Sequence, residues 1–115
     1  MSVTVITRRT VLERDGYACV RCGTYVGPFG DYSIHHRRPR GMGGSKRPDT
    51  NQPANLVTLC GSGVTGCHGW AESNRDEARA LGLLLWQSQT PSAEPVRTHR
   101  GLLLLDDKGG WEVSA

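Results

Sequence analysis

Four cysteines are the residues of this 115-residue sequence whose types and spacing most directly indicate chemistry. They form two pairs, Cys19-x2-Cys22 and Cys60-x6-Cys67, separated by 37 residues, and each pair stands in a glycine-bearing stretch. Four thiolates are a typical tetrahedral ligand set for Zn²⁺. The alternatives are disulfides or a thioredoxin-like redox pair, and the redox pair lacks its usual strand–helix context. We therefore predict a structural zinc site formed by all four cysteines.

Histidines and a carboxylate suggest a second centre. His35 and His36 are adjacent at the end of an expected strand, where neighbouring side chains point to opposite faces, so one can face a metal and the other a substrate. His68 and Glu72 stand four residues apart and share one face of an expected helix. We predict that His35, His68 and Glu72 bind a catalytic divalent ion. The carboxylate favours Mg²⁺ or Mn²⁺.

Positive charge is concentrated directly after these histidines. The chain has a net charge of +3, but residues 1–48 carry nine basic and three acidic residues, whereas residues 49–115 carry five basic and eight acidic residues. A localised basic patch is typical of proteins that bind polyanions, although a solvated loop is the alternative. The residues predicted to contact the phosphates of a polyanion, DNA-binding residues if that partner is DNA, are Arg37, Arg38, Arg40, Lys46 and Arg47.

The composition predicts a small hydrophobic core that a bound metal would have to supplement. Hydrophobic residues make up 37% of the chain, and it contains 15 Gly and 6 Pro. Small domains with little apolar material usually need a metal or disulfide, and a structural zinc contributes on the order of 10 kcal/mol. The longest apolar run, 82–86, is far shorter than the roughly 20 residues of a membrane span. Without a secretory leader in the sequence, we expect a cytoplasmic protein.

The elements that must position these residues follow from local patterns. We expect, in chain order, a helix over 7–15, a strand over 30–36, a long loop over 39–54, a second strand over 55–60, a second helix over 67–81 and a hairpin over 102–113. The fold class is α+β, a small irregular domain. Residues 1–86 would form the domain with both sites, and residues 87–115 would form a linker and a C-terminal β-hairpin appendage.

In this order, the motifs resemble those of the HNH endonuclease family, in particular its small zinc-bearing phage type. The resemblance covers residues 17–82 and rests on Cys19-x-x-Cys22, Ile34-His35-His36-Arg37-Arg38-Pro39, Gly43-Gly44, Asn55-Leu56-x-x-Leu59-Cys60 and Cys67-His68-Gly69-Trp70. It implies a ββα-metal core. The strand of the paired histidines, the basic loop, strand 56–60 and helix 67–81 would form this core.

The resemblance also implies roles for single residues. His36 would be the general base that activates water for attack on the phosphorus, and His35 the metal ligand preceding it. Asn55 would position the loop between the strands, and His68 would be the last histidine of the motif. An imidazole suits proton abstraction near neutral pH, and a hard divalent cation stabilises charge on phosphate. The implied function is a metal-dependent DNA endonuclease, with phage terminase subunits as implied partners in genome packaging.

Two features depart from the family pattern. Position 72 is Glu where relatives often carry His or Asn, which leaves open that Glu72 is a surface residue and that water or Asn74 completes the site. The gap between Cys60 and Cys67 is wider than the usual two residues. Two other functions stay open: a non-catalytic zinc-stapled module that binds DNA or protein, and a secreted nuclease toxin, which the missing signal disfavours.

Overall fold

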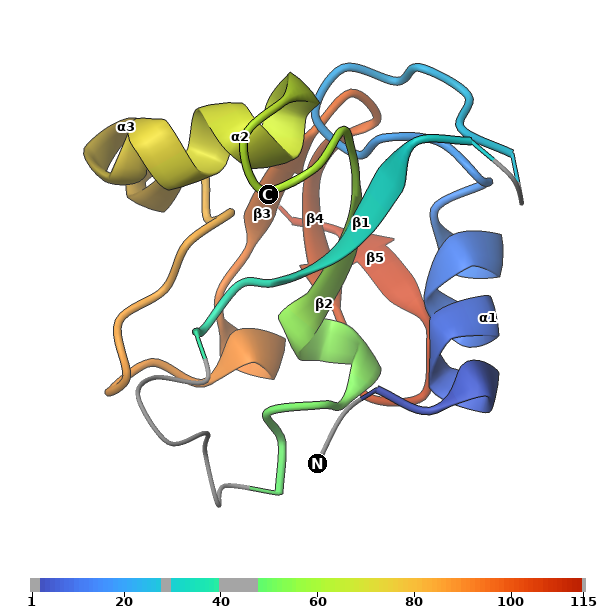
Figure 1. Cartoon of the computed structure of the whole chain (residues 1–115). Coiled ribbons are helices and arrows are strands. Elements are labelled where there is room, and N and C mark those ends of the chain that lie inside the picture. Colours follow the sequence, from blue (N-terminus) through green and yellow to red (C-terminus); the bar gives the residue numbers. More distant parts are fainter. Residues whose placement is uncertain (1–2, 28–29, 40–47, 115) are drawn as a thin grey trace.

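The computed structural model describes residues 3–27, 30–39 and 48–114, which form an α+β fold (Figure 1). The described part contains three α-helices and two antiparallel sheets, as the sequence predicts for the fold class. In chain order the elements are α1 (Val5–Arg14), β1 (Tyr32–His36), η1 (Pro53–Asn55), β2 (Leu56–Cys60), α2 (Gly66–Ser73), α3 (Arg75–Ala80), η2 (Pro91–Ala93), β3 (Val96–Thr98), β4 (Gly101–Leu105) and β5 (Trp111–Val113).

The strand pair β1–β2 carries the paired histidines. The strands are antiparallel, with His35 opposite Val57 and His36 opposite Leu56. Apart from Thr58, β2 is apolar, and it is buried up to Cys60 at its end. Helix α2 packs against both strands. His35 is buried whereas His36 is partly exposed, as expected for neighbouring residues of a strand. The sheet therefore gives the two imidazoles different surroundings.

The predicted helix 67–81 is two helices. The break falls at Asn74, whose backbone has φ −125° and ψ 60°. Its side-chain amide donates to the Trp70 carbonyl at 2.9 Å, and its backbone N–H donates to the same carbonyl at 2.8 Å. Asparagine side chains compete with the backbone for hydrogen bonds in this way and favour helix ends. Glu72 consequently stands in the last turn of α2.

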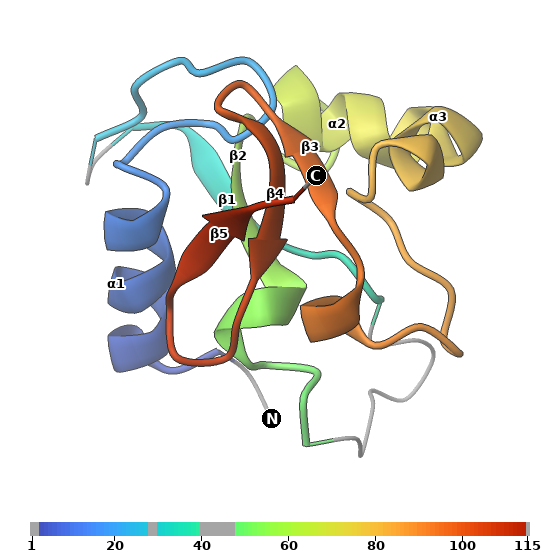
Figure 2. The ribbon, with the colours of Figure 1, turned by 180° about the vertical axis from the view of Figure 1, so that it is seen from behind.

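The C-terminal residues belong to the core and are not an appendage. Figure 2 shows the sheet β3–β4–β5 lying over β1 and β2, and Val96, Leu103 and Leu105 pack into one cluster with Val57 and Leu59. The sequence division at residue 86 therefore does not separate two cores. β3 was not predicted because three residues are too short to show alternation.

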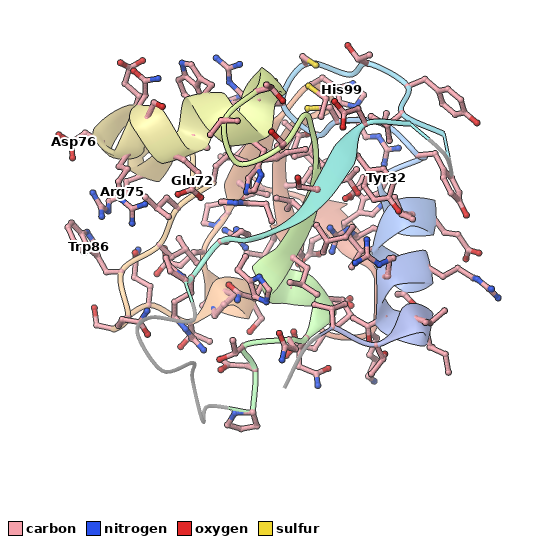
Figure 3. All side chains as sticks on the ribbon, in the orientation of Figure 1. Tyr32, Glu72, Arg75, Asp76, Trp86 and His99 are labelled. Atoms are coloured by element: carbon pink, nitrogen blue, oxygen red, sulfur yellow. The ribbon has the colours of Figure 1, made fainter. Side chains whose placement is uncertain are left out.

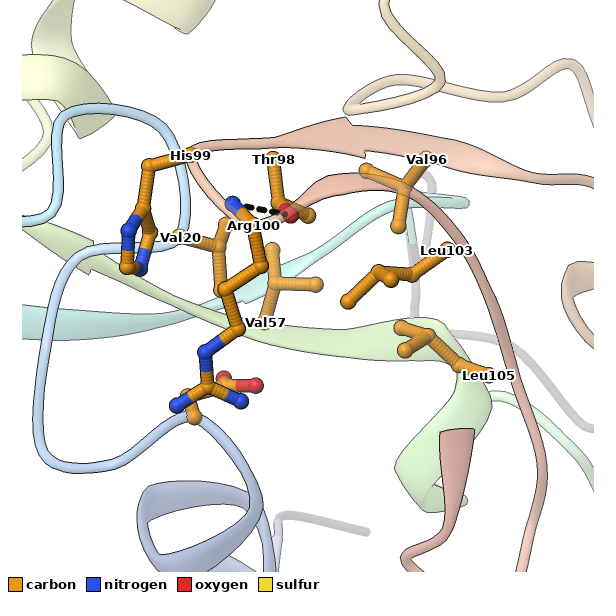
Figure 4. Close-up of a pocket in the computed structure, with 9 residues that line it drawn as sticks. Val20, Val57, Val96, Thr98, His99, Arg100, Leu103 and Leu105 are labelled. Atoms are coloured by element: carbon orange, nitrogen blue, oxygen red, sulfur yellow. Dashed lines mark hydrogen bonds between the residues drawn. The ribbon is translucent and has the colours of Figure 1, made fainter. Parts of the chain in front are cut away.

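Between the sheets lies a cavity of about 10 Å³, bordered by Val20, Val57, Leu103 and Leu105 (Figure 4). That volume accommodates about one water molecule, so the cavity is too small for a substrate. In the described chain, every helix falls short of the length and apolar character needed to cross a membrane.

Candidate metal centres

The four cysteines form one cluster. Cys19 and Cys22 lie in the turn after α1, Cys60 ends β2, and Cys67 lies in the first turn of α2. All four sulfurs lie within 4.8 Å of one another, with 3.8 Å between Cys22 Sγ and Cys60 Sγ, and all four are free thiols rather than disulfides. The prediction of a single four-cysteine cluster is confirmed. Four thiol groups this close together can hold a metal ion such as zinc.

Two glycines close the six-residue gap of the second cysteine pair. Gly61 and Gly66 have φ of +87° and +62°, in the region that favours glycine. A Cβ on Gly66 would lie 2.5 Å from the Cys60 carbonyl oxygen, and one on Gly61 would lie 2.2 Å from that of Thr65. The chain can therefore turn back on itself and bring Cys67 to Cys60 despite the wide spacing.

The surroundings of the cluster differ between its sulfurs. Burial raises the pKa of Cys67 to about 12, although Arg21 Nη1 donates to its Sγ at 3.4 Å. The pKa of Cys22 is lowered to about 6, because hydrogen bonds with Thr24 and with the thiols of Cys19 and Cys67 outweigh the opposing effect of burial. The guanidinium of Arg21 also stacks 3.7 Å from the Trp70 ring. A bound cation would hold the buried thiols as thiolates.

The second predicted set also comes together. His35 of β1 meets His68 and Glu72 of α2, and one ligand atom from each lies within 4.8 Å of the others. Glu72 Oε1 lies 3.9 Å from His35 Nδ1 and 3.8 Å from His68 Nε2. Asn74, the alternative to Glu72, instead donates its amide to Trp70. Two imidazoles and a carboxylate fit a divalent ion that keeps open positions for other ligands.

A hydrogen bond fixes the tautomer of His35. Its Nε2 lies 2.7 Å from the Leu83 carbonyl oxygen, which can only accept, so Nε2 carries the proton and Nδ1 keeps its lone pair toward Glu72. Burial lowers the pKa of His35 to about 4, so the ring is neutral at physiological pH. His68 Nδ1 is buried and has no hydrogen-bond partner in the described chain. The tautomer of His35 therefore leaves Nδ1 able to bind a cation, and His68 turns Nε2 toward the same carboxylate.

His36 points to a different partner. Its Nε2 lies 2.8 Å from Asn51 Oδ1, an acceptor that fixes the ring with the proton on Nε2 and the lone pair on Nδ1. Sequence reasoning missed Asn51, whose only signal was its place in a long polar loop. Asn51 therefore joins the candidate site as the residue that orients His36.

Asn55 holds the two ends of the loop between the strands. Its fully buried side chain accepts from the Arg38 backbone N–H at 2.7 Å and donates to the carbonyls of Arg38 and Thr50 at 3.1 and 2.8 Å. These bonds fix the backbone that follows His36 and precedes Asn51. Asn55 therefore links the two ends of the loop between β1 and β2.

The prediction that Arg37 and Arg38 contact phosphates is wrong. Both side chains are buried. Arg37 donates to four carbonyls at 2.7 to 3.0 Å, those of Ala54, Gly82, Pro91 and Glu94. Arg38 pairs with the Asp49 carboxylate and donates to the Gln89 carbonyl. Both stabilise the fold, and charge counting cannot distinguish such arginines from exposed ones. Arg40, Lys46 and Arg47 lie outside the described residues.

Replacing Arg37 with methionine should lower the free energy of unfolding by about 3–5 kcal/mol, because it leaves several buried carbonyls without donors. Urea unfolding measures the loss. Arg97 in β3 is exposed, and the matched variant Arg97→Met should change stability by no more than about 0.5 kcal/mol. Unchanged stability together with weaker DNA binding in Arg37→Met would restore the phosphate-contact role.

Comparisons of the chain with protein-family models, with curated proteins and with solved structures find no significant match.

Proposed function

We propose that this protein is a metal-dependent DNA endonuclease that hydrolyses phosphodiester bonds. The observation that carries the proposal is the cluster of His35, His68 and Glu72, whose donor atoms lie within 4.8 Å of one another, beside His36 on the same strand. In this proposal β1, β2 and α2 are a ββα-metal core. Terminase subunits are the proposed partners, in the cytoplasm of a phage host.

The chain's own residues divide the reaction between them. His35 Nδ1, His68 and Glu72 would hold the divalent ion, and the bound ion would supply Lewis-acid stabilisation of the phosphate charge. His36 would take the proton of the attacking water on Nδ1, because Asn51 keeps the other ring nitrogen protonated. Asn55 would keep His36 in place through the loop that it closes.

The four-cysteine cluster lies next to the second cluster in the chain and would hold the elements of that cluster in place. Cys67 and His68 are consecutive residues in the first turn of α2, and Cys60 ends the strand that pairs with β1. An ion held by the four sulfurs would therefore fix the start of α2 against the end of β2. We propose zinc as this structural ion, with Mg²⁺ or Mn²⁺ in the second cluster.

Supercoiled plasmid incubated with the protein tests the proposal. Mg²⁺ or Mn²⁺ should yield open-circle or linear DNA, and EDTA should prevent this. Glu72→Gln, which removes a charged metal ligand, should reduce the rate by at least about 10-fold. Glu77→Gln is the matched control, because Glu77 is exposed on α3 and outside the cluster. Intact plasmid with every divalent ion tested, from folded metal-loaded protein, would rule out the nuclease.

The second candidate is a zinc-stapled module that binds DNA or a protein without chemistry. The four-cysteine cluster favours it, because that cluster is a complete tetrahedral set and accounts for the stability of a small domain without any reaction. This candidate predicts one tightly bound zinc and DNA binding that His35→Ala and His68→Ala leave unchanged. Cleavage that depends on His35 and His68 would exclude it.

A further inference from the structure

Arg75, the first residue of α3, lies at the outer edge of the second cluster. Its Nη1 donates to Glu72 Oε2 at 3.3 Å, and its side chain is 45% exposed. The other oxygen of the same carboxylate faces the imidazoles, at 3.9 Å from His35 and 3.8 Å from His68. Glu72 thus bridges the histidine pair and the guanidinium, and Figure 3 shows Glu72 and Arg75 next to each other.

Neighbouring arginines in the described chain are engaged elsewhere. Arg37 and Arg38 are buried against carbonyls and a carboxylate. Arg21 stacks on Trp70 and donates to Cys67. Arg79 stacks 3.7 Å from the Trp86 ring and pairs with Asp76 at 3.3 Å. Among the residues described, Arg75 is therefore the arginine that both contacts the cluster and is substantially open to solvent.

We propose that Arg75 binds a non-bridging phosphate oxygen of the DNA strand at the second cluster. This inference rests on the proposed function and names a substrate contact that charge patterning assigned to other arginines. A guanidinium has five N–H donors in a planar fork that matches phosphate oxygens, and Glu72 takes one of them. The ion pair with Glu72 holds the fork at the site before DNA arrives, which reduces the ordering needed on binding.

Fluorescence anisotropy of labelled duplex DNA in Ca²⁺ buffer tests this contact, with a gel to verify that the DNA stays intact. Removing one phosphate-binding cation should lower the magnitude of the slope of log K against log salt concentration by about 0.9. Arg75→Gln should therefore show a slope smaller by about 0.9 and weaken binding uniformly across sequences. Arg75→Lys, which keeps the charge, should retain the wild-type slope.

Arg79→Gln is the matched control, because Arg79 also pairs with a carboxylate three residues away at 3.3 Å, but with one outside the cluster. Its salt slope should equal that of the wild type. Titration of Mn²⁺ into Arg75→Gln should give a dissociation constant no weaker than that of the wild type, since the ligands are intact and the lost charge is positive like that of the ion. An Mn²⁺ affinity weaker by about 10-fold with an unchanged salt slope would instead make Arg75 a positioning residue for Glu72.

The two proposals fail in different ways. DNA binding by the wild type with equal salt slopes for Arg75→Gln and Arg79→Gln overturns the Arg75 contact and leaves the nuclease intact. A wild-type protein that binds no DNA overturns the proposed function and the Arg75 contact with it.

Discussion

Replacing His36 with alanine is expected to reduce DNA cleavage by about 10²- to 10⁴-fold, the usual contribution of a general base. The side chain is partly exposed at the end of β1, and its Nε2 is held by Asn51 at 2.8 Å. His36 is separate from the cluster formed by His35, His68 and Glu72. The variant should therefore fold and bind Mn²⁺ like the wild type. Single-turnover nicking of supercoiled plasmid measures the loss.

His99→Ala is the control for this variant, because His99 is exposed in the turn between β3 and β4 and belongs to neither cluster. Its nicking rate should match that of the wild type. The nicking rate of Asn51→Ala should fall between those of His36→Ala and His99→Ala, since the base is present but no longer oriented. Undiminished cleavage by His36→Ala would remove His36 from the reaction and leave the metal cluster without its proposed base.

Removing the zinc ion that we propose for the four-cysteine cluster is expected to unfold the domain. A structural zinc contributes on the order of 10 kcal/mol, which is comparable to the total stability of about 5–15 kcal/mol of a typical domain. Cys19 and Cys67 also belong to the core cluster, so a zinc ion bound there would stabilise the same region as the core. Chelation, or Cys60→Ser, should abolish the cooperative thermal transition measured by circular dichroism.

Val64→Ala provides the matched control, because Val64 lies between Cys60 and Cys67 and is 89% exposed. It should retain one zinc per chain by elemental analysis and unfold at the wild-type temperature. A metal-free protein that melts cooperatively at an unchanged temperature would show that the apolar core suffices. In that case the low apolar content of the chain would not require a bound metal for stability.

Much of the fold could be predicted because it depends on short-range patterns. α1, β1 and β2 match the expected helix and strands closely, and the hairpin β4–β5 matches the apolar runs around Asp106 to Gly110. The break at Asn74 was missed because a single asparagine in a sequence rich in Ala, Glu and Arg barely changes helix propensity. Its effect comes from one side-chain hydrogen bond to Trp70.

The partners of polar side chains could not be predicted in the same way. Arg37 follows a histidine pair in a basic run, which favours a surface role. Its side chain instead meets carbonyls from residues 17 to 57 positions further along the chain. Asn51 is likewise an ordinary loop residue until the loop brings it to His36. Such contacts depend on how the loop closes, and Asn55 closes it.

The sequence by itself determined the types and the local spacings of the candidate ligands in both clusters. Two cysteine pairs in glycine-bearing turns, and His68 four residues before Glu72, restrict each set of donors through local backbone geometry. The tertiary structure decided which arginine side chains are buried and which residue orients His36. It also decided that Arg75 lies beside the cluster of His35, His68 and Glu72. Burial and long-range pairing depend on the packing of distant segments, whereas spacing within one turn of chain does not.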